Sequence, residues 1–362
     1  MNRTTLRAAA SAAAVLSLTL TACSAANEDG GSDDTASDLS GTLAGGGASS
    51  QEAAVAAWRA GFQTANPEVT VNYDPAGSGA GREQFIAGGF SFAGSDAYLD
   101  DEELADAQAR CSDGEIVEVP VYVSPIAVIY NLEGVDELNL SPSVIGEIFA
   151  GEITQWNDDA IAADNPDAEL PDTAITAVHR SDESGTTENF TEYLDQASDG
   201  AWPHGPVETW PIEDGEAASG TSGVVAAVEG GNGTIGYADL SQAGELGTVN
   251  VQVGESFTEP TPEAAAKSLE AATPVEGRGE TDLAVDLDRT TTEDGVYPIV
   301  LISYQIACQT YEDAAEGELV KAFLSYIASE EGQSASSESA GSAPLTGDFA
   351  ERVRAAIETI GS

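Results

Sequence analysis

Apolar and polar positions alternate in short runs from residue 39 onward, and each run fits a strand or a helix. Residues 39–43, 69–73 and 90–93 have the composition and alternation of strands. Between them, apolar side chains recur at helical spacing in residues 52–63, and residues 82–87 form a second helical pattern. This alternation of strands and helices predicts an α/β layer with a mostly parallel sheet.

Two longer β-branched runs, residues 117–130 and 296–308, follow in the chain. The first contains Pro120 and Pro125, and a single central strand tolerates prolines poorly because each removes a backbone N–H donor. We therefore predict a strand that leaves a first lobe, a crossing segment, and a strand that enters a second lobe. The second run predicts the return crossing.

This path predicts a two-lobed α/β fold with a hinge of two crossing segments and a cleft between the lobes. The expected bounds are 40–121 plus 299–362 for lobe I, and 122–298 for lobe II. Helical patterns at 316–330 and 348–360 are expected to close lobe I.

The N-terminus has the pattern of an export signal. A region with two arginines precedes an apolar run at residues 8–20, which is too short for a comfortable membrane span. The run ends in Leu-Thr-Ala-Cys23, which resembles a bacterial lipobox. We expect residues 1–22 to be a lipoprotein signal peptide, Cys23 to be acylated, and residues 23–39 to form an acidic flexible tether. An ordinary secretory signal with a chance cysteine is the alternative.

Charge narrows the possible partners. The chain has 12 Lys and Arg against 63 Asp and Glu, a formal net charge of -51. This charge excludes non-specific binding to nucleic acid and electrostatic attraction to anionic lipid. Any membrane contact is therefore expected through the lipid anchor alone, and any anion site must be local and built mostly from neutral donors.

Cysteine usage fits an exported protein. Apart from Cys23, only Cys111 and Cys308 remain. Two thiols in an oxidising compartment favour one disulfide, and the predicted chain path places both in lobe I. Two unpaired buried thiols are the alternative.

Three segments each combine a strand end, a turn rich in Gly and Ser, and a helix start: residues 45–52, 76–82 and 180–187. Ser49 has the spacing of a capping box, and Ser78 is expected to cap the second helix. Each segment alone is most often only a cap. Together they present free N–H groups at the carboxyl ends of strands, where α/β folds bind ligands, and Arg180 adds a forked cationic donor.

Asp96 also follows a predicted strand, beside Gly and Ser. A carboxylate suits an anion site only when the anion carries a proton, as hydrogen phosphate and dihydrogen phosphate do. Sulfate has no proton at neutral pH and would leave the carboxylate unpaired, so Asp96 predicts selectivity against sulfate.

With these pieces the chain resembles the phosphate-binding lipoproteins of the phosphate-specific ABC importer, the PstS family. The resemblance spans residues 40–360. Its motifs occur in family order: Gly45-Gly-Gly-Ala-Ser49, Asn72-Tyr73, Gly77-Ser78-Gly79, Phe92-Ala-Gly-Ser-Asp96, Ile148-Phe-Ala-Gly-Glu-Ile-Thr-Gln-Trp156, Arg180-Ser-Asp-Glu-Ser-Gly-Thr186 and Gly233-Thr-Ile-Gly-Tyr237.

The resemblance implies a fold of the type 2 periplasmic-binding class, which captures inorganic phosphate between its lobes and delivers it to the permease and ATPase subunits of an importer. It implies a protein anchored to the outer face of the cell membrane, with no cofactor, no metal and no enzymatic activity. The implied phosphate-binding residues are Ser49, Ser50, Ser78, Asp96, Arg180, Ser184, Gly185 and Thr186. The last three are also expected to cap the third helix, and Asp182 is expected to orient or temper Arg180 from behind. Many members have Thr then Phe where this chain has Ser49 and Ser50, so the apolar lid that Phe would supply is absent.

Three alternatives remain open from the sequence. A receptor for another oxyanion is disfavoured by Asp96. A secreted phosphoester hydrolase would use Ser78 or Ser184, but it would need a base or metal beside the serine, and the sequence supplies neither. A surface adhesin or sensor could retain the fold, and phosphate-dependent partner binding would identify it.

Overall fold

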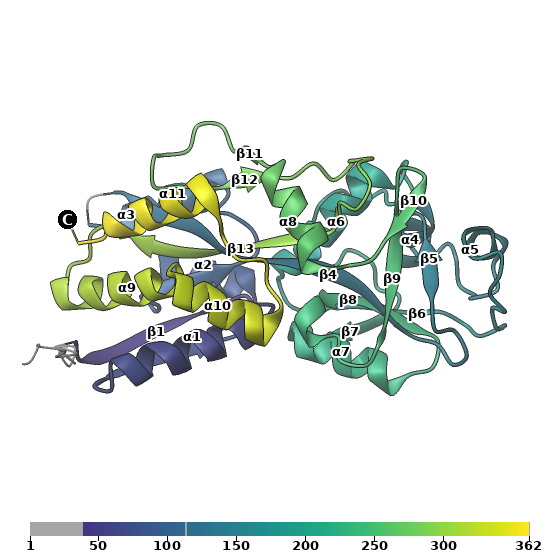
Figure 1. The fold of residues 1–362 in the computed structure, drawn as a ribbon, viewed down its shortest axis with the longest axis horizontal. Helices are drawn as coiled ribbons and strands as arrows, with labels where there is room; N and C mark the ends of the chain where they lie inside the picture. The colour runs from purple at the N-terminus through teal and green to yellow at the C-terminus, as the bar shows by residue number, and fades with distance from the viewer. Residues whose placement is uncertain (1–38, 113, 362) are drawn as a thin grey trace, which may run out of the picture. The chain divides into compact units, whose positions relative to one another are not determined.

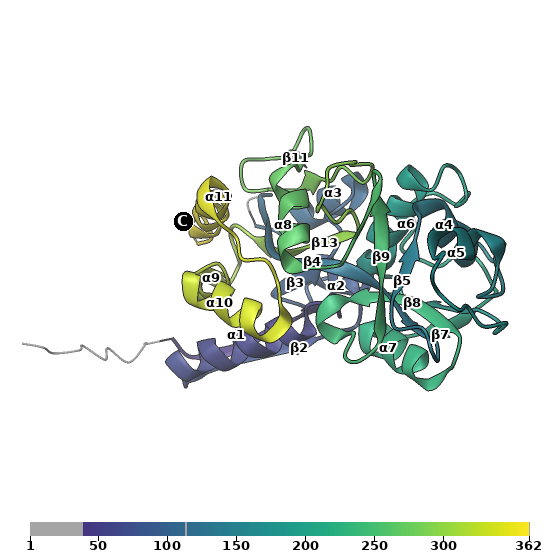
Figure 2. The same ribbon diagram turned by 45° about the vertical axis from the view of Figure 1, so that its right-hand side comes forward.

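The computed structural model describes residues 39–112 and 114–361, so the predicted signal peptide, Cys23 and nearly all of the tether lie outside the described residues. The described residues form a two-lobed α/β unit (Figures 1 and 2). The first lobe contains β1 (Gly41–Gly47), α1 (Glu52–Ala65), β2 (Val69–Asp74), α2 (Ser78–Ile86), β3 (Phe92–Ser95), α3 (Asp101–Arg110), α9 (Ala314–Ile327), α10 (Glu330–Ala340) and α11 (Gly347–Glu358).

Two strands, β4 (Ile116–Asn131) and β13 (Val300–Cys308), belong to the sheet path that joins the lobes. The second lobe contains β5 (Leu138–Leu140), α4 (Pro142–Phe149), α5 (Asp159–Asp164), β6 (Thr176–Arg180), α6 (Gly185–Ala197), β7 (Glu216–Ala218), α7 (Gly220–Gly230), β8 (Thr234–Asp239), η1 (Leu240–Gln242), β9 (Gly247–Val253) and β10 (Ser256–Thr258). The return segment adds α8 (Pro262–Glu270), β11 (Thr273–Pro274) and β12 (Val285–Asp286).

An 11-stranded sheet runs through both lobes in the order β2-β1-β3-β13-β4-β8-β6-β7, and β9 joins it beside β4. The outer pairs are parallel, as the sequence predicts: β1 with β2 and β3, and β6 with β7 and β8. The centre is antiparallel, because the chain leaves the first lobe along β4 and returns along β13. The predicted parallel layer is confirmed for β1, β2 and β3, and the two crossing strands add antiparallel pairs that the alternation of strands and helices did not predict.

The predicted break within residues 117–130 is wrong, because β4 is one continuous strand of 16 residues. Pro120 lies beside an irregularity in the pairing with β13, where Val121 has no partner in the register. Pro125 is the last residue that pairs with β13, and Ile126 begins the pairing with β8. Both prolines therefore occupy positions where the ladder is interrupted or changes partner, which is where a strand tolerates a missing donor.

Several element bounds differ from the sequence prediction because glycines occur inside regular elements. β1 continues to Gly47, and α2 begins at Ser78 rather than at residue 82. A Cβ on Gly81 would lie 2.5 Å from the Gly47 Cα, so the helix crosses the strand at glycine on both sides. The late helical pattern at 316–330 corresponds to α9, and the serine-rich α10 that follows was not predicted, because its composition hides its helical period.

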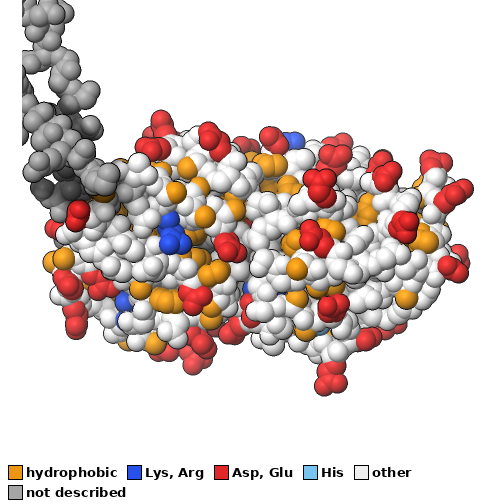
Figure 3. Space-filling model, turned by 90° about the horizontal axis from the view of Figure 1, so that it is seen from below, with side chains coloured by type: hydrophobic (Ala, Val, Ile, Leu, Met, Phe, Trp, Pro, Cys, Tyr) orange, Lys and Arg blue, Asp and Glu red, His pale blue; other side chains and the backbone are white. Residues whose placement is uncertain are grey.

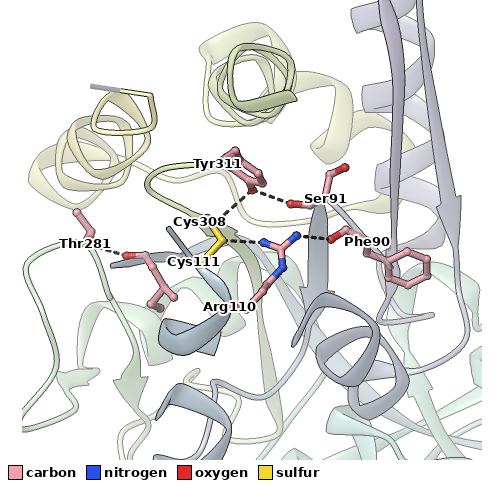
Figure 4. Close-up of a disulfide and its surroundings, with 8 residues drawn as sticks. Phe90, Ser91, Arg110, Cys111, Thr281, Cys308 and Tyr311 are labelled. Carbon is pink, nitrogen blue, oxygen red and sulfur yellow. Dashed lines mark hydrogen bonds between the residues drawn. A yellow bond between two sulfur atoms is a disulfide. The ribbon is translucent and has the colours of Figure 1, made fainter. Parts of the chain in front are cut away.

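A disulfide joins Cys111 after α3 to Cys308 at the end of β13, with a Cα–Cα distance of 5.3 Å (Figure 4). The structure agrees with the predicted pair in the first lobe. Arg110 donates to Cys308 Sγ at 2.7 Å and to the Phe90 carbonyl at 3.0 Å, and Tyr311 donates to the Ser91 carbonyl at 2.6 Å. These contacts tie the late strand β13 to the loop that precedes β3.

An aromatic cluster fixes the second lobe behind β6. Phe190 of α6 stacks on Tyr237 of β8 with ring centroids 4.4 Å apart, and Trp210 stacks on His179 at 4.9 Å. The Tyr237 hydroxyl accepts a hydrogen bond from the Arg180 backbone N–H at 3.2 Å, so the cluster positions the last residue of β6. No helix among residues 39–112 and 114–361 is long and apolar enough to cross a membrane.

Candidate functional site

Four helix starts meet where the two lobes touch. Those of α1 and α2 belong to the first lobe, and those of α6 and α7 belong to the second. Ser49, before α1, accepts a hydrogen bond from the Thr221 N–H of α7 at 3.0 Å. Gly185, the first residue of α6, has room only for hydrogen, because a Cβ there would lie 2.9 Å from Ser78 Oγ and from Asp96 Cβ. The first N–H groups of a helix have no carbonyl partner within it, so this junction concentrates free donors.

Two of the three predicted caps are wrong. The N-cap of α1 is Gln51 rather than Ser49, and the N-cap of α2 is Gly77 rather than Ser78. Gly77 has φ +109°, a backbone conformation that residues other than glycine rarely adopt. The helix therefore begins directly after this glycine, and Ser78 is its first residue. Ser78 Oγ instead accepts from the Asp96 backbone N–H at 3.1 Å. The third prediction holds, because Ser184 caps α6 by accepting from the Thr187 N–H at 3.2 Å.

Asp96, directly after β3, is 3% exposed and lies at the centre of this junction. Its carboxylate accepts hydrogen bonds from the hydroxyls of Ser50 at 2.7 and 2.8 Å and of Thr186 at 2.8 Å. Ser303 of β13 donates to it at 2.6 Å. Burial raises the pKa of Asp96, while the three hydroxyl donors and the charge of Arg180 oppose the rise. Ser50 therefore contributes a hydroxyl donor to Asp96.

Arg180 is 2% exposed and pairs with Asp182 two residues on. Its Nε donates to Asp182 Oδ1 at 2.8 Å, and its Nη2 donates to the other oxygen of the same carboxylate. Asp182 also accepts from the Gly220 N–H at the start of α7, at 3.0 Å. Burial pushes the pKa of Asp182 upward, but the hydrogen bonds and charge of Arg180 and the Gly220 N–H lower it overall. The fork of Arg180 is thereby fixed in orientation.

Cations are scarce around this junction, and Figure 3 shows a face on which acidic side chains far outnumber Lys and Arg. Arg180 and Arg82 are both buried rather than exposed. Arg82, on α2, bonds Glu103 at 2.8 and 2.9 Å and reaches Glu208 of the second lobe at 2.6 Å. An anion at this site would therefore be bound by donors within the junction and not by a positively charged surface. Within the described part of the chain, no group of three metal-ligating side chains occurs.

Sequence reasoning missed three polar residues at this junction. Thr221 contacts Ser49, and Ser303 and Gln51 lie behind Asp96. A signal for Thr221 was present, because residues 219–221 repeat the Ser-Gly-Thr step of residues 184–186. Ser303 and Gln51 carry no local signal, because their partners are distant in sequence.

Among the residues that the structure describes, neither serine suggested for a hydrolase hydrogen-bonds to a side-chain base. Ser78 Oγ accepts from a backbone N–H, and so does Ser184 Oγ. His179, the nearer histidine in sequence, contacts the Arg180 carbonyl through Nδ1 at 2.9 Å and stacks on Trp210. These contacts give neither serine a proton acceptor suited to nucleophilic catalysis.

A two-lobed α/β unit whose helix starts meet between the lobes defines the class of extracytoplasmic solute-binding proteins. The model of the PBP superfamily domain matches residues 32–331. The phosphate-binding protein PstS3 of Mycobacterium bovis (strain BCG / Pasteur 1173P2) is 39% identical over 325 residues, covering 88% of this chain and 86% of that protein. The phosphate-binding protein PstS 2 of Mycobacterium tuberculosis (strain ATCC 25618 / H37Rv) is 36% identical over 318 residues, covering 86% and 85%.

Solved structures show the same fold. A high-affinity periplasmic phosphate-binding protein (PfluDING) bound with phosphate superposes with a TM-score of 0.71 at 23% identity, covering 87% of this chain and 93% of that chain. A phosphate-binding protein from Stenotrophomonas maltophilia superposes with a TM-score of 0.67 at 21% identity, with the same coverage of 87% and 93%. The chain therefore belongs to the PBP superfamily and, within it, to the PstS family, which consists of substrate-binding proteins and not of enzymes.

Proposed function

We propose that this protein is an extracytoplasmic receptor that captures inorganic phosphate between its lobes and delivers it to the permease and ATPase subunits of an ABC importer. One observation carries the proposal: a buried carboxylate, Asp96, and a buried guanidinium, Arg180, meet at the junction of four helix starts. The family relationship supports the same ligand, because the relatives named above are phosphate-binding proteins.

Each group has a distinct task at the ligand. Arg180 supplies a charge-assisted donor, since its Nη1 has no hydrogen-bond partner among the described residues. The remaining proposed donors are hydroxyl and backbone groups at the helix starts, namely Ser49, Ser50, Ser78, Ser184, Gly185 and Thr186. Asp96 accepts the proton of the bound hydrogen phosphate, and Asp182 holds Arg180 in place. Neutral donors suit a protein of net charge -51, because they bind an anion without further Lys or Arg residues, of which this chain has few.

The proposal extends to the chain's organisation. Residues 1–22 would be removed as a signal peptide, and lipidated Cys23 would anchor the protein to the outer face of the cell membrane. The two lobes would divide at 40–121 plus 299–362 and at 122–298, with the pairing of β4 and β13 as the hinge.

A substitution at Arg180 tests the ligand site. In Arg180→Ala, the free energy of phosphate binding should weaken by several kcal/mol, since each hydrogen bond to a charged group contributes about 1.5–3 kcal/mol. Arg180→Lys keeps the charge but loses the fork, so its loss should be intermediate. Arg59→Ala is the matched control, because Arg59 donates to the Val71 carbonyl of the first lobe. Equilibrium dialysis with labelled phosphate measures all three, and unchanged affinity in Arg180→Ala would refute the site.

A further inference from the structure

A chain of buried amides and a hydroxyl ends on Asp96 from within the sheet. All nine residues of β13 are buried, yet Ser303 and Gln305 on this strand are polar. Gln51, the N-cap of α1, is also fully buried. Burying a polar side chain costs free energy unless it is hydrogen-bonded, so these three side chains are expected to bond to buried partners.

The hydrogen bonds run in one direction. Gln305 Nε2 donates to Gln51 Oε1 at 2.8 Å, and Gln51 Nε2 donates to Ser303 Oγ. Gln51 Nε2 is also 3.4 Å from the Tyr304 carbonyl, which fixes the orientation of the amide, because an amide oxygen there would face another oxygen. Since Ser303 Oγ accepts from Gln51, its own proton is available to Asp96 Oδ1, 2.6 Å away.

We propose that Ser303, oriented by Gln51, is a specificity-determining positioning residue that keeps Asp96 ionised and so preserves the rejection of sulfate below neutral pH. This inference rests on the proposed phosphate site. An ionised Asp96 can only accept a hydrogen bond and therefore repels an anion without a proton. A protonated Asp96 can donate, and sulfate then becomes an acceptable ligand.

Ser303 differs from the other two hydroxyl donors in its position. Ser50 and Thr186 stand at the starts of α1 and α6, where a bound anion competes for their protons. Ser303 lies within the sheet, with its Oγ also 3.2 Å from the Ser95 carbonyl. It is therefore the donor that stays with Asp96 when ligand binds. Burial raises the pKa of Asp96, and the Ser303 bond is the first of the interactions that lower it.

Other charged and titratable groups also face Asp96. Arg180 of β6 lowers the pKa of Asp96, whereas Tyr73 of β2 stays neutral because burial, and then the charge of Asp96, raise its pKa. A cavity of about 310 Å³ beside Asp96 is also lined by Tyr98, Asp100, Glu188, Glu192, Asp286, Arg289 and Tyr304. Burial raises the pKa of Glu188 to about 7, so the charge of Glu188 changes near neutral pH, and its effect must be separated from that of Asp96.

The test compares sulfate and phosphate affinities by calorimetry from pH 5 to 8.5 in the stripped full-length protein. As the pH falls, sulfate binding to Ser303→Ala should begin at a pH about 1–2 units higher than in the unchanged protein, because the variant loses a hydrogen bond to the charged carboxylate of Asp96. The control Ser336→Ala removes a buried hydroxyl that pairs with Ser342 at 2.6 Å, and its sulfate profile should not move. Making both comparisons again in a Glu188→Gln background removes the second titrating group.

Each outcome has one meaning. A sulfate onset that is the same in Ser303→Ala and Ser336→Ala would overturn the role of Ser303. If Ser303→Ala does not fold, Gln51→Leu provides the test, because it removes the donor that orients Ser303; its onset should shift in the same direction by less, and no shift would again overturn the inference. If the unchanged protein binds no phosphate at any pH, the proposed function itself fails.

Discussion

Replacing Arg82 with Met should destabilise the protein, because Arg82 is the buried cation that links carboxylates of the two lobes. Arg82 is 4% exposed and bonds two carboxylates, Glu103 from its own lobe and Glu208 from the other. Its Nη1 also donates to Ser95 Oγ at 3.0 Å. The substitution leaves both carboxylates near Glu183 and Glu188 with no cation between them.

The expected loss follows from this burial. Breaking a buried ion pair by removing one partner costs about 3–5 kcal/mol. The Glu103 and Glu208 side chains are 24% and 15% exposed, so water relieves part of the cost and places the loss near the lower end, about 3 kcal/mol. With an unfolding entropy of about 2.1 cal/mol/K per residue, a unit of this size shifts by about 1.5 °C per kcal/mol, so Tm should fall by about 4–5 °C.

Urea denaturation and thermal melts at pH 7.5 measure this loss. Arg59→Met is the matched control, because Arg59 bonds only the Val71 carbonyl among the described residues, and it should lose less than about 1 kcal/mol. The double change Arg82→Met with Glu208→Gln should recover part of the stability, since it removes one unpaired carboxylate. A loss below about 0.5 kcal/mol in Arg82→Met, the range of ordinary surface changes, would refute this reasoning.

Three further predictions test other parts of the structure. Burial, then repulsion by Glu208, raises the pKa of Glu188 to about 7, so the folded protein loses stability as pH rises from about 4.5 to 7. Glu188→Gln should therefore be about 1–3 kcal/mol more stable than the unchanged protein at pH 8 and equal to it at pH 4, as measured by urea titration; an equal gain at both pH values would contradict this sign. Asp96→Asn should admit sulfate at pH 7.5 in competition dialysis, because the amide can donate to it, and continued exclusion of sulfate would remove the role given to Asp96. Reducing the disulfide between Cys111 and Cys308, 197 residues apart, should cost about 2–5 kcal/mol of stability in melts with and without reductant, and a Tm unaffected by reductant would count against it.

Local patterns predicted part of the site well. Ser184 was correctly placed as a cap, because a Ser-Gly-Thr step before an amphipathic run fixes the start of a helix within a few residues. The same logic failed at Ser49 and Ser78. There, the start of each helix depends on close contacts of glycines, such as Gly81 against Gly47, which a sequence pattern does not reveal.

The polar groups behind Asp96 could not be predicted locally at all. Ser303 lies in a fully buried strand and contacts a carboxylate 207 residues earlier. Gln51 reads as an ordinary helix-start residue, yet its partners are 252 and 254 residues away. Such contacts follow from the antiparallel return of β13 beside β3, and the predicted return crossing did not specify which strand of the first lobe β13 would join.

The most direct test of the central claim is a calorimetric titration of the phosphate-stripped protein, first with phosphate and then with sulfate, in matched buffer at pH 7.5. The account predicts tight one-to-one phosphate binding and no heat from sulfate, because only phosphate brings a proton to Asp96. Sulfate binding of comparable strength would contradict the assigned ligand. Silence with both anions would contradict the receptor function.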